Sequence, residues 1–240
     1  MIGVLTYNIP HRKTQDVLFR LKALVDEDVI VVIMPFVNRP VWKPLFQHRP
    51  SLAIEMLPSV LATKLNYKYF EVSDLLKFLK SLTFNLEPII IAGAGILDSE
   101  VVENWKVVNT HPGYLPYGRG LDSLKWSIYN NWPIGCTTHL VSQDVDAGLL
   151  VEQIKTKIYP LDSFYSLAIR HYELEIEMLV SAIQKYRFAS KLLPIHFCDD
   201  AGLEEVSPIY KRMPHDKEII MLKRLDKRIM DLNPEFYSFF

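Results

Sequence analysis

Short apolar runs alternate with segments of helical periodicity along the first part of the chain. The runs lie at residues 2–6, 29–34 and 88–92 and are rich in Ile, Val and Leu. Continuous apolar runs of this length predict strands that are buried on both faces of a sheet. In the segment after the first run, Val17, Leu18, Leu21 and Leu24 recur at helical spacing. The β-helix-β order predicts an α/β, Rossmann-like fold, with a mostly parallel twisted sheet flanked by helices.

The same patterns predict further elements and an uneven division of the chain. Helices are expected at residues 57–66, 73–82, 99–105, 124–130 and 163–186, and a strand at 67–72. The tail contains a charged helix, residues 216–230, whose expected buried face is Ile219, Ile220, Leu222, Leu225 and Ile229. We expect one catalytic domain over residues 1–190 and a short C-terminal extension, a loop plus a helix, over 191–240.

Two polar side chains that can take part in hydrogen-bonding or acid–base chemistry follow a predicted strand. Asn109 and His111 come directly after the apolar run 106–108, and the carboxyl ends of strands are where open α/β sheets bind ligands. Residues two positions apart on an extended chain point the same way, so an amide donor stands beside a base. The Pro and Gly residues of segment 112–120 predict a stiff, irregular loop after them. Singly, an Asn or a His at this place is often structural.

A second segment supplies a carboxylate. Residues 135–141 form a β-branched run with strand character, residues 142–148 a polar turn, and residues 149–154 another apolar strand. Asp146 in that turn is placed to complete the pair Asn109 and His111, although an Asp before Ala-Gly is also a common turn residue. In the alternating strand, His139 faces the same side as Thr137, toward either the site or the core.

These two segments together resemble the formyltetrahydrofolate-dependent formyltransferases. The motifs are N-T-H-P-G-Y-L-P-Y-G-R-G and, downstream, G-C-T-T-H-L-V-S-Q-D-V-D-A-G. Several motifs in the right order are far more specific than one pattern. The resemblance implies the formyltransferase fold, catalytic roles for Asn109, His111 and Asp146, an auxiliary role for His139, and N10-formyltetrahydrofolate as co-substrate.

The resemblance also implies where the folate lies. In the family the pterin sits between two loops and is contacted largely by backbone groups. The corresponding positions are Gly95, Ile96 and Leu97 on one side, and Ser142, Gln143, Asp144 and Val145 on the other. For Ile96 and Leu97 the plain alternative is ordinary core packing.

The acceptor amine is the less determined part. Purine-pathway members carry a glycine-rich phosphate loop after the first strand, where this chain has T-Y-N-I-P-H-R-K. The tail motif Y-K-R-M-P most resembles the sugar-nucleotide N-formyltransferases, which implies a dTDP-linked sugar such as dTDP-4-amino-4,6-dideoxyglucose, used in O-antigen and lipopolysaccharide synthesis. Glycinamide ribonucleotide, hydrolysis of the folate, and a non-catalytic folate-binding role are the alternatives. The candidate substrate-binding residues are Tyr7, Asn8, Arg12, Lys13, Trp42 and Tyr117.

The implied chemistry suits these side chains. An amide N–H aimed at the developing oxyanion of a tetrahedral intermediate contributes about 2.7–4 kcal/mol to barrier lowering, and Asn109 suits that role. His111 can donate to the same oxygen or take the amine proton, and Asp146 can orient the imidazole or accept a proton through a water molecule.

Composition narrows the partners. Lys and Arg number 27 against 28 Asp and Glu, so the net charge of −1 gives no basic field for nucleic acid. The two cysteines, Cys136 and Cys198, lack the spacing of a metal site, and no metal is expected. No leader and no run of membrane-spanning length is evident, so we expect a cytoplasmic protein. Apolar positions in the tail helix suggest a homodimer.

Overall fold

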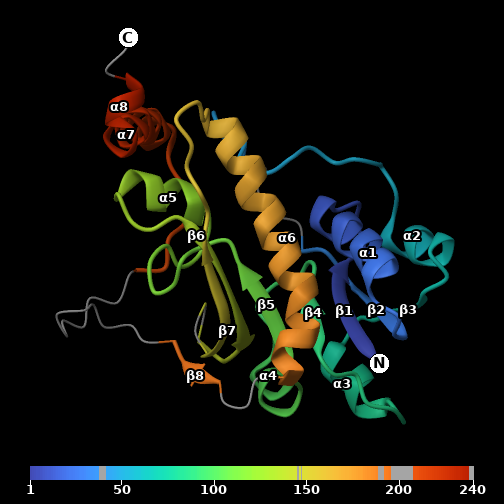
Figure 1. Cartoon of the computed structure of the whole chain (residues 1–240). Coiled ribbons are helices and arrows are strands. Elements are labelled where there is room, and N and C mark those ends of the chain that lie inside the picture. The colour runs from blue at the N-terminus through green and yellow to red at the C-terminus, as the bar shows by residue number, and fades with distance from the viewer. Residues whose placement is uncertain (38–41, 145, 147, 189–191, 196–207, 238–240) are drawn as a thin grey trace.

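The structure is a computed structural model that describes residues 1–37, 42–144, 146, 148–188, 192–195 and 208–237. Its described strands form one eight-stranded sheet (Figure 1). The strands are β1 (Ile2–Tyr7), β2 (Val29–Met34), β3 (Lys68–Glu71), β4 (Ile89–Ile91), β5 (Val107–His111), β6 (Gly135–Val141), β7 (Gly148–Lys155) and β8 (Leu193–Pro194). They lie in the order β3-β2-β1-β4-β5-β6-β7-β8.

The sheet changes character at β5. The pairs β2–β3, β1–β2, β1–β4 and β4–β5 are parallel. The pairs β5–β6, β6–β7 and β7–β8 are antiparallel. The predicted α/β class with a mostly parallel sheet is confirmed, and β5 is the strand with one neighbour of each kind.

The helices largely match the predicted segments. They are α1 (Arg12–Leu24), α2 (Pro58–Lys64), α3 (Leu75–Ser81), α4 (Ser99–Asn104), α5 (Ser123–Tyr129), α6 (Phe164–Phe188), α7 (His215–Leu232) and α8 (Pro234–Tyr237). Asp74 and Asp98 cap α3 and α4 by accepting from the backbone N–H groups of Lys77 and Glu100, each at 2.9 Å. Within the described residues, no helix combines the length and apolarity needed to cross a membrane.

Alternate residues of the strands face two different helical layers. On one face, Val4 and Val31 pack with α1, α2 and the long helix α6, which runs across the sheet in Figure 1. On the other face, Leu5 and Val32 pack with Leu79 of α3 and residues of α4. This period of two is the reason why the apolar runs contain no polar alternation. Leu24, predicted as part of the apolar stripe of α1, is instead 69% exposed and is the last residue of that helix.

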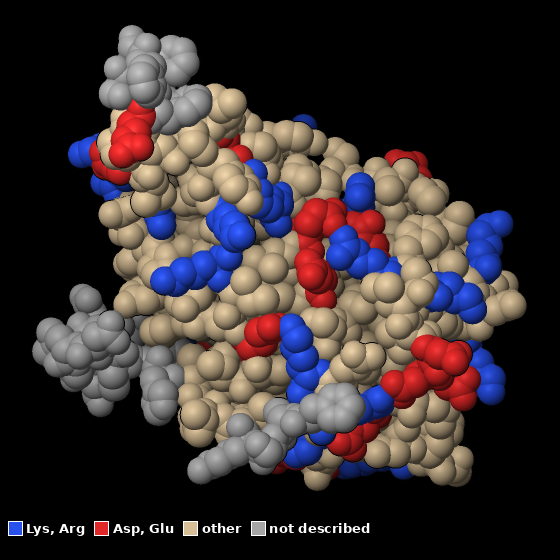
Figure 2. Space-filling model, in the orientation of Figure 1, with Lys and Arg blue, Asp and Glu red and all other residues tan. Residues whose placement is uncertain are grey.

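The described part of the tail packs on the rest of the chain. Met213, Met221, Leu225 and Ile229 form one cluster with residues of α5 and the start of α6. Whether residues 191–240 constitute a separate extension stays a prediction. Lys and Arg lie beside Asp and Glu over much of the face shown in Figure 2, in keeping with a net charge of −1.

The expected buried face of the tail helix is partly wrong. Ile219 and Ile220 are 49% and 40% exposed, whereas Glu218 and Met221 are fully buried. The inward face of α7 is set by positions 218, 221, 225 and 229, and residues 219 and 220 lie away from it around the helix. A buried carboxylate at position 218 is the reason that apolarity alone gave the wrong face.

Glu218 joins three parts of the chain. Its carboxylate forms an ion pair with Lys125 of α5, and both side chains are fully buried. Its second oxygen accepts a hydrogen bond from the backbone N–H of Leu45 at 2.8 Å. A buried charge is tolerated only when it is paired and hydrogen-bonded, so α5, α7 and the segment around residue 45 are held together.

Removing the lysine tests this arrangement. Lys125→Met leaves Glu218 buried without its counter-charge, and we expect the free energy of unfolding to fall by about 3–5 kcal/mol. Urea unfolding at pH 7, followed by circular dichroism, measures the loss. Lys223→Met, on the exposed side of α7, is the matched control and should change the value little. Equal losses in the two variants would contradict the assigned role.

Candidate active site

The predicted pair Asn109 and His111 stands on β5, where the sheet changes from parallel to antiparallel. His111 is the last residue of the strand and is buried, whereas Asn109 is half-buried. In the ladder with β6, Asn109 lies opposite His139 and His111 lies opposite Thr137. Residues that are opposite each other in a ladder share a face, so the amide, the imidazole and His139 lie on one side of the sheet.

The structure brings Asp146 to this pair. His111 Nδ1 lies 3.2 Å from Asp146 Oδ1. The other carboxylate oxygen, Oδ2, accepts a hydrogen bond from the backbone N–H of Gly120 at 2.6 Å. Asp146 adopts a left-handed conformation with φ 51°, which Asp tolerates better than most residues. One carboxylate therefore bridges the imidazole and the loop that follows β5.

The opposite edge of the imidazole is also held. His111 Nε2 lies 2.9 Å from the carbonyl oxygen of Gly118 and 3.1 Å from Ser123 Oγ. A carbonyl oxygen only accepts, so Nε2 carries a hydrogen that it donates there. Ser123 was not identified from the sequence. It stands at the first position of α5, after residues 112–120, which we call the signature loop, and serine at a helix start is usually explained by capping.

Glycine at position 113 is required by close approach. A Cβ atom at this position would lie 2.6 Å from His111 Nε2 and 2.9 Å from the carbonyl oxygen of Gly118. The imidazole thus occupies the space that a side chain at residue 113 would need.

Thr137 fixes the loop from the neighbouring strand. Its hydroxyl donates to the carbonyl of Gly113 at 2.8 Å and accepts from the backbone N–H of Leu115 at 3.0 Å. Gln153 of β7 donates to the same hydroxyl at 2.9 Å and to the carbonyl of Leu115 at 2.5 Å. These bonds satisfy backbone groups that have no sheet partner, which is how an irregular buried loop is stabilised.

Helix α6 also forms a hydrogen bond with the loop after β5. His171 Nε2 donates to the carbonyl of Pro112 at 3.1 Å, and its Nδ1 lies 2.8 Å from Thr156 Oγ1. Burial lowers the pKa of His171 from 6.5 to about 4, although the bond to Pro112 opposes that change. The neutral ring can donate at one nitrogen and accept at the other, which matches the two neighbours.

One turn further along α6, Glu175 lies close to β5. Its carboxylate is 2.8 Å from Lys13 Nζ and 3.2 Å from Arg49 Nη2, and Lys13 also lies 3.5 Å from the carbonyl of Thr110. Burial alone would raise the pKa of Glu175, but Arg49 and Lys13 outweigh it and lower the pKa to about 2. The carboxylate is therefore charged and holds both cations.

The proposed substrate cations are less accessible than expected. Lys13 is buried against Glu175. Arg12 pairs with Asp16 at 2.7 Å and donates to the carbonyl of Ser51 at 2.8 Å. Asn8 Oδ1 accepts from the backbone N–H of Phe36 at 2.8 Å.

The aromatic candidates lie at different places. The ring centroid of Trp42, which is 40% exposed, lies 4.8 Å from that of His215. The ring of Tyr117 lies 5.6 Å from that of Trp132. Tyr7 instead lines a cavity at the carboxyl ends of β1, β2 and β4.

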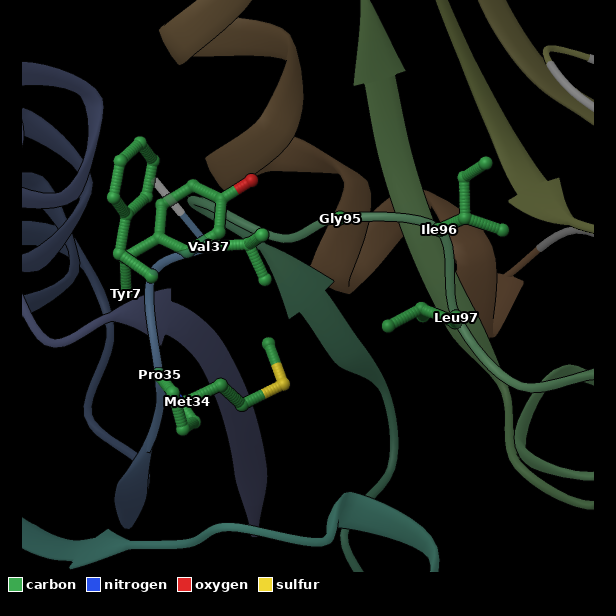
Figure 3. Close-up of a pocket in the computed structure, with 8 residues that line it drawn as sticks. Tyr7, Met34, Pro35, Val37, Gly95, Ile96 and Leu97 are labelled. Atoms are coloured by element: carbon green, nitrogen blue, oxygen red, sulfur yellow. The ribbon is translucent and has the colours of Figure 1, made fainter. Parts of the chain in front are cut away.

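This cavity joins Tyr7 with the first predicted folate loop. It has a volume of about 180 Å³ and is lined by Tyr7, residues 34–37 and Gly95, Ile96 and Leu97. Figure 3 shows Met34 and Leu97 directed toward one another across the space. Ile96 is 89% exposed, so core packing does not explain it, whereas Leu97 packs partly against the core.

The second predicted folate loop does not line the same cavity. Ser142 Oγ lies 3.4 Å from the carbonyl of Asp144, and Gln143 donates to the carboxylate of Glu103. Val145 lies outside the described residues. His139, the auxiliary candidate, is buried, and its Nδ1 lies 3.2 Å from the carbonyl of Leu140.

Comparison with known proteins adds a family to this geometry. Residues 65–183, which contain β4 to β7 and most of α6, match the formyl transferase family. This part of the chain belongs to that family. The match includes Asn109, His111 and Asp146.

Two relatives of this chain are named for formyl transfer to different acceptors. The phosphoribosylglycinamide formyltransferase of Haemophilus influenzae is 33% identical over 105 residues, 42% of this chain and 49% of that protein. The dTDP-4-amino-4,6-dideoxyglucose formyltransferase of Mycobacterium tuberculosis is 29% identical over 90 residues, 38% of each chain. The match thus spans less than half the length of these two relatives.

A solved structure extends the likeness in fold to nearly the whole chain. A sugar N-formyltransferase from Shewanella superposes with a TM-score of 0.60 at 20% identity, covering 94% of this chain and 88% of that chain. The formyltransferase fold predicted from the motifs is confirmed.

The buried histidine of α6 makes stability depend on pH. The pKa of His171 in the folded chain, about 4, lies below its ordinary value, so the unfolded chain binds more protons between pH 6.5 and 4. The contribution of neutral His171 to the free energy of unfolding is fully present above pH 6.5. It falls as the pH falls, with a slope of about 1.4 kcal/mol per pH unit. His171→Gln should show a shallower slope in urea unfolding measured from pH 7 to 4.5. An unchanged slope would contradict this account.

Proposed function

We propose that the chain transfers the formyl group of N10-formyltetrahydrofolate to the amino group of a nucleotide-linked amino sugar, such as dTDP-4-amino-4,6-dideoxyglucose. The observation that carries the proposal is the pairing of His111 with Asp146 at the end of β5, with Asn109 two residues before His111 on the same face of the strand. Gly120 and Gly118 hold the carboxylate and the imidazole in place.

The reaction follows from these contacts. The neutral amine attacks the formyl carbon, and the new C–N bond forms while negative charge develops on the formyl oxygen. The Asn109 amide donates to that oxygen, and the Asp146 carboxylate, which His111 orients, accepts the amine proton through a water molecule. The bond from the formyl carbon to N10 of the folate then breaks, and N10 receives a proton.

The cavity beside the site suits the folate. A flat heteroaromatic ring requires apolar walls with a few backbone donors and acceptors. Gly95, Ile96 and Leu97 supply one wall, and the exposed side chain of Ile96 is free to cover the ring. Ser142, Gln143 and Asp144, which do not line this cavity, belong to the turn that carries Asp146 and would contact the folate from that side.

The amino sugar would approach from the ends of β1 and β5. Tyr7 ends β1 and Asn8 follows it, and Trp42 and Tyr117 offer ring faces for a base or sugar. Arg12 is the more accessible of the two candidate cations for the diphosphate, since Lys13 is buried. Lys13 instead pairs with Glu175 and lies near the carbonyl of Thr110, so its proposed role is to support β5.

The wider role follows from the substrate class. Because the proposed product is a formylated nucleotide sugar, we propose that the protein acts in the cytoplasm, in O-antigen and lipopolysaccharide synthesis. The exposed apolar residues of α7 support a homodimer, because such residues are often covered by a second copy. They are Ile219, Ile220, Met230 and Leu232.

The deciding experiment is formyl transfer from N10-formyltetrahydrofolate to a panel of amines. The panel holds dTDP- and UDP-linked 3-amino and 4-amino sugars, glycinamide ribonucleotide and a control without amine. Released tetrahydrofolate is followed by absorbance and the product by mass. We expect one nucleotide sugar to gain a formyl group, and Asn109→Ala to lower kcat by about 100- to 1000-fold. His111→Ala and Asp146→Asn should also lose activity.

Two other outcomes of this assay correspond to the activities for which two relatives are named. Glycinamide ribonucleotide as the preferred acceptor would place the chain with the H. influenzae relative. Equal release of tetrahydrofolate across the panel and in the control would indicate hydrolysis, since a formyltetrahydrofolate deformylase of Arabidopsis thaliana is 32% identical over 81 residues. Either result would overturn the amino-sugar assignment.

Gly113 gives a test of geometry alone. Gly113→Ala puts a methyl group where the imidazole lies, so His111 must move. A displacement of about 1 Å at a reacting group costs on the order of 100-fold, and we expect kcat in the transfer assay to fall by that factor. Ser81→Ala, on the distant helix α3, is a control with an equally small change. Wild-type kcat in Gly113→Ala would show that the close approach of residue 113 to His111 does not matter.

A further inference from the structure

A second cavity lies away from the site described above. It has a volume of about 460 Å³ and is formed where β6 begins, where β7 ends, and along the last turns of α7. Asn131, Pro133 and Ile134 line it on one side, and Leu232 and Asn233 on the other. The turn that carries Asp146 lies at the opposite end of β6 and β7, so this cavity is not the folate cavity.

The cavity contains a cation that the described protein does not neutralise. Arg228 lines the cavity, and its Nη1 donates to the carbonyl of Trp132 at 2.8 Å. Among the described residues, no carboxylate forms an ion pair with it. Burial lowers the pKa of Arg228, which shows that desolvation is not offset by an opposite charge. A half-buried guanidinium with spare donors is a binding group for an anion.

Lys155 adds a second positive charge. It ends β7 and lines the same cavity, and its Nζ lies 5.5 Å from the ring centroid of Tyr114. Within the described part of the chain it also has no carboxylate partner. In Figure 2, over α5 and the adjoining part of β6, Lys and Arg side chains gather with few Asp or Glu beside them. The local field is therefore positive in a molecule of almost zero net charge.

The remaining lining indicates the shape of the ligand. Pro133, Ile134, Ile158 and Leu232 provide apolar surface, and the amides of Asn131 and Asn233 provide polar contacts. A cavity of this volume falls within the range that accommodates metabolite-sized ligands, about 300–1,000 Å³. Apolar walls with two cations match a molecule that joins a phosphate group to an organic body.

We propose that Arg228 and Lys155 form a second ligand site, distinct from the formyl-transfer site, which binds a phosphorylated metabolite of nucleoside monophosphate size. The phosphate lies between the two cations, and the organic body lies against the apolar wall. The site adjoins the signature loop, because Lys155 Nζ lies over the ring of Tyr114, three residues after His111.

Calorimetric titration of the full chain tests this, with inorganic phosphate and dTMP as separate probes in a phosphate-free buffer. We expect both probes to bind, and dTMP to bind more tightly because it also contacts the apolar wall. Arg228→Gln and Lys155→Gln should each weaken binding about tenfold or more, the usual effect of losing one charge-assisted hydrogen bond. Lys227→Gln, which removes the same charge from the exposed neighbour on α7, should bind as the wild type does.

The controls separate this site from the proposed active site. His111→Ala should bind both probes with wild-type affinity, so a failure of formyl transfer would not affect the result. Arg228→Lys keeps the charge and serves if Arg228→Gln unfolds, and melting curves of every variant monitor folding. Equal affinities in Arg228→Gln, Lys155→Gln and Lys227→Gln, or no binding of either probe to the wild type, would overturn the proposal. Equal affinities of phosphate and dTMP would overturn the nucleotide-sized body.

Discussion

The buried carboxylate of Glu175 is the constraint on which the arrangement of the site depends. It lies under the sheet on α6 and neutralises Lys13 of α1 and Arg49 of the segment after β2. A single charged group thus joins three segments whose positions in the sequence are far apart. Buried charges of this kind cost several kcal/mol unless every one is paired, so the three segments have few alternative arrangements. Lys13 Nζ also lies 3.5 Å from the carbonyl oxygen of Thr110, and this contact connects the ion pairs of Glu175 to β5.

The loop that follows β5 is ordered by hydrogen bonds from neutral side chains. Thr137, His171 and Gln153 take up backbone groups of the loop after His111, which has no ladder of its own. Because these partners come from β6, α6 and β7, the loop is fixed by the scaffold rather than by local turn geometry. Side chains held rigidly in this way are what positional catalysis requires.

Local sequence predicted the parts that depend on periodicity and on motifs. The apolar runs predicted β1, β2 and β4, and the expected helical segments 73–82 and 99–105 contain α3 and α4. The pairing of His111 with Asp146 followed from a family motif. Ser123 and Glu175 were missed because their roles depend on long-range contacts, and each has an ordinary local explanation as a helix residue. Ile219 and Ile220 were misplaced because the inward face of α7 contains Glu218, a charge that pairs only after folding.

The tail takes part in the site through its backbone. Tyr210 N donates to the carbonyl of Arg119 at 2.9 Å, and the N–H of Leu121 donates to the carbonyl of Tyr210 at 2.8 Å. Gly120 lies between these bonds with φ 88°, and a side chain there would collide with the backbone of Tyr210. The same glycine donates its N–H to Asp146. Residue 210 therefore fixes a donor to the carboxylate that orients His111, so the segment after residue 208 belongs to the architecture of the site as much as the signature loop does.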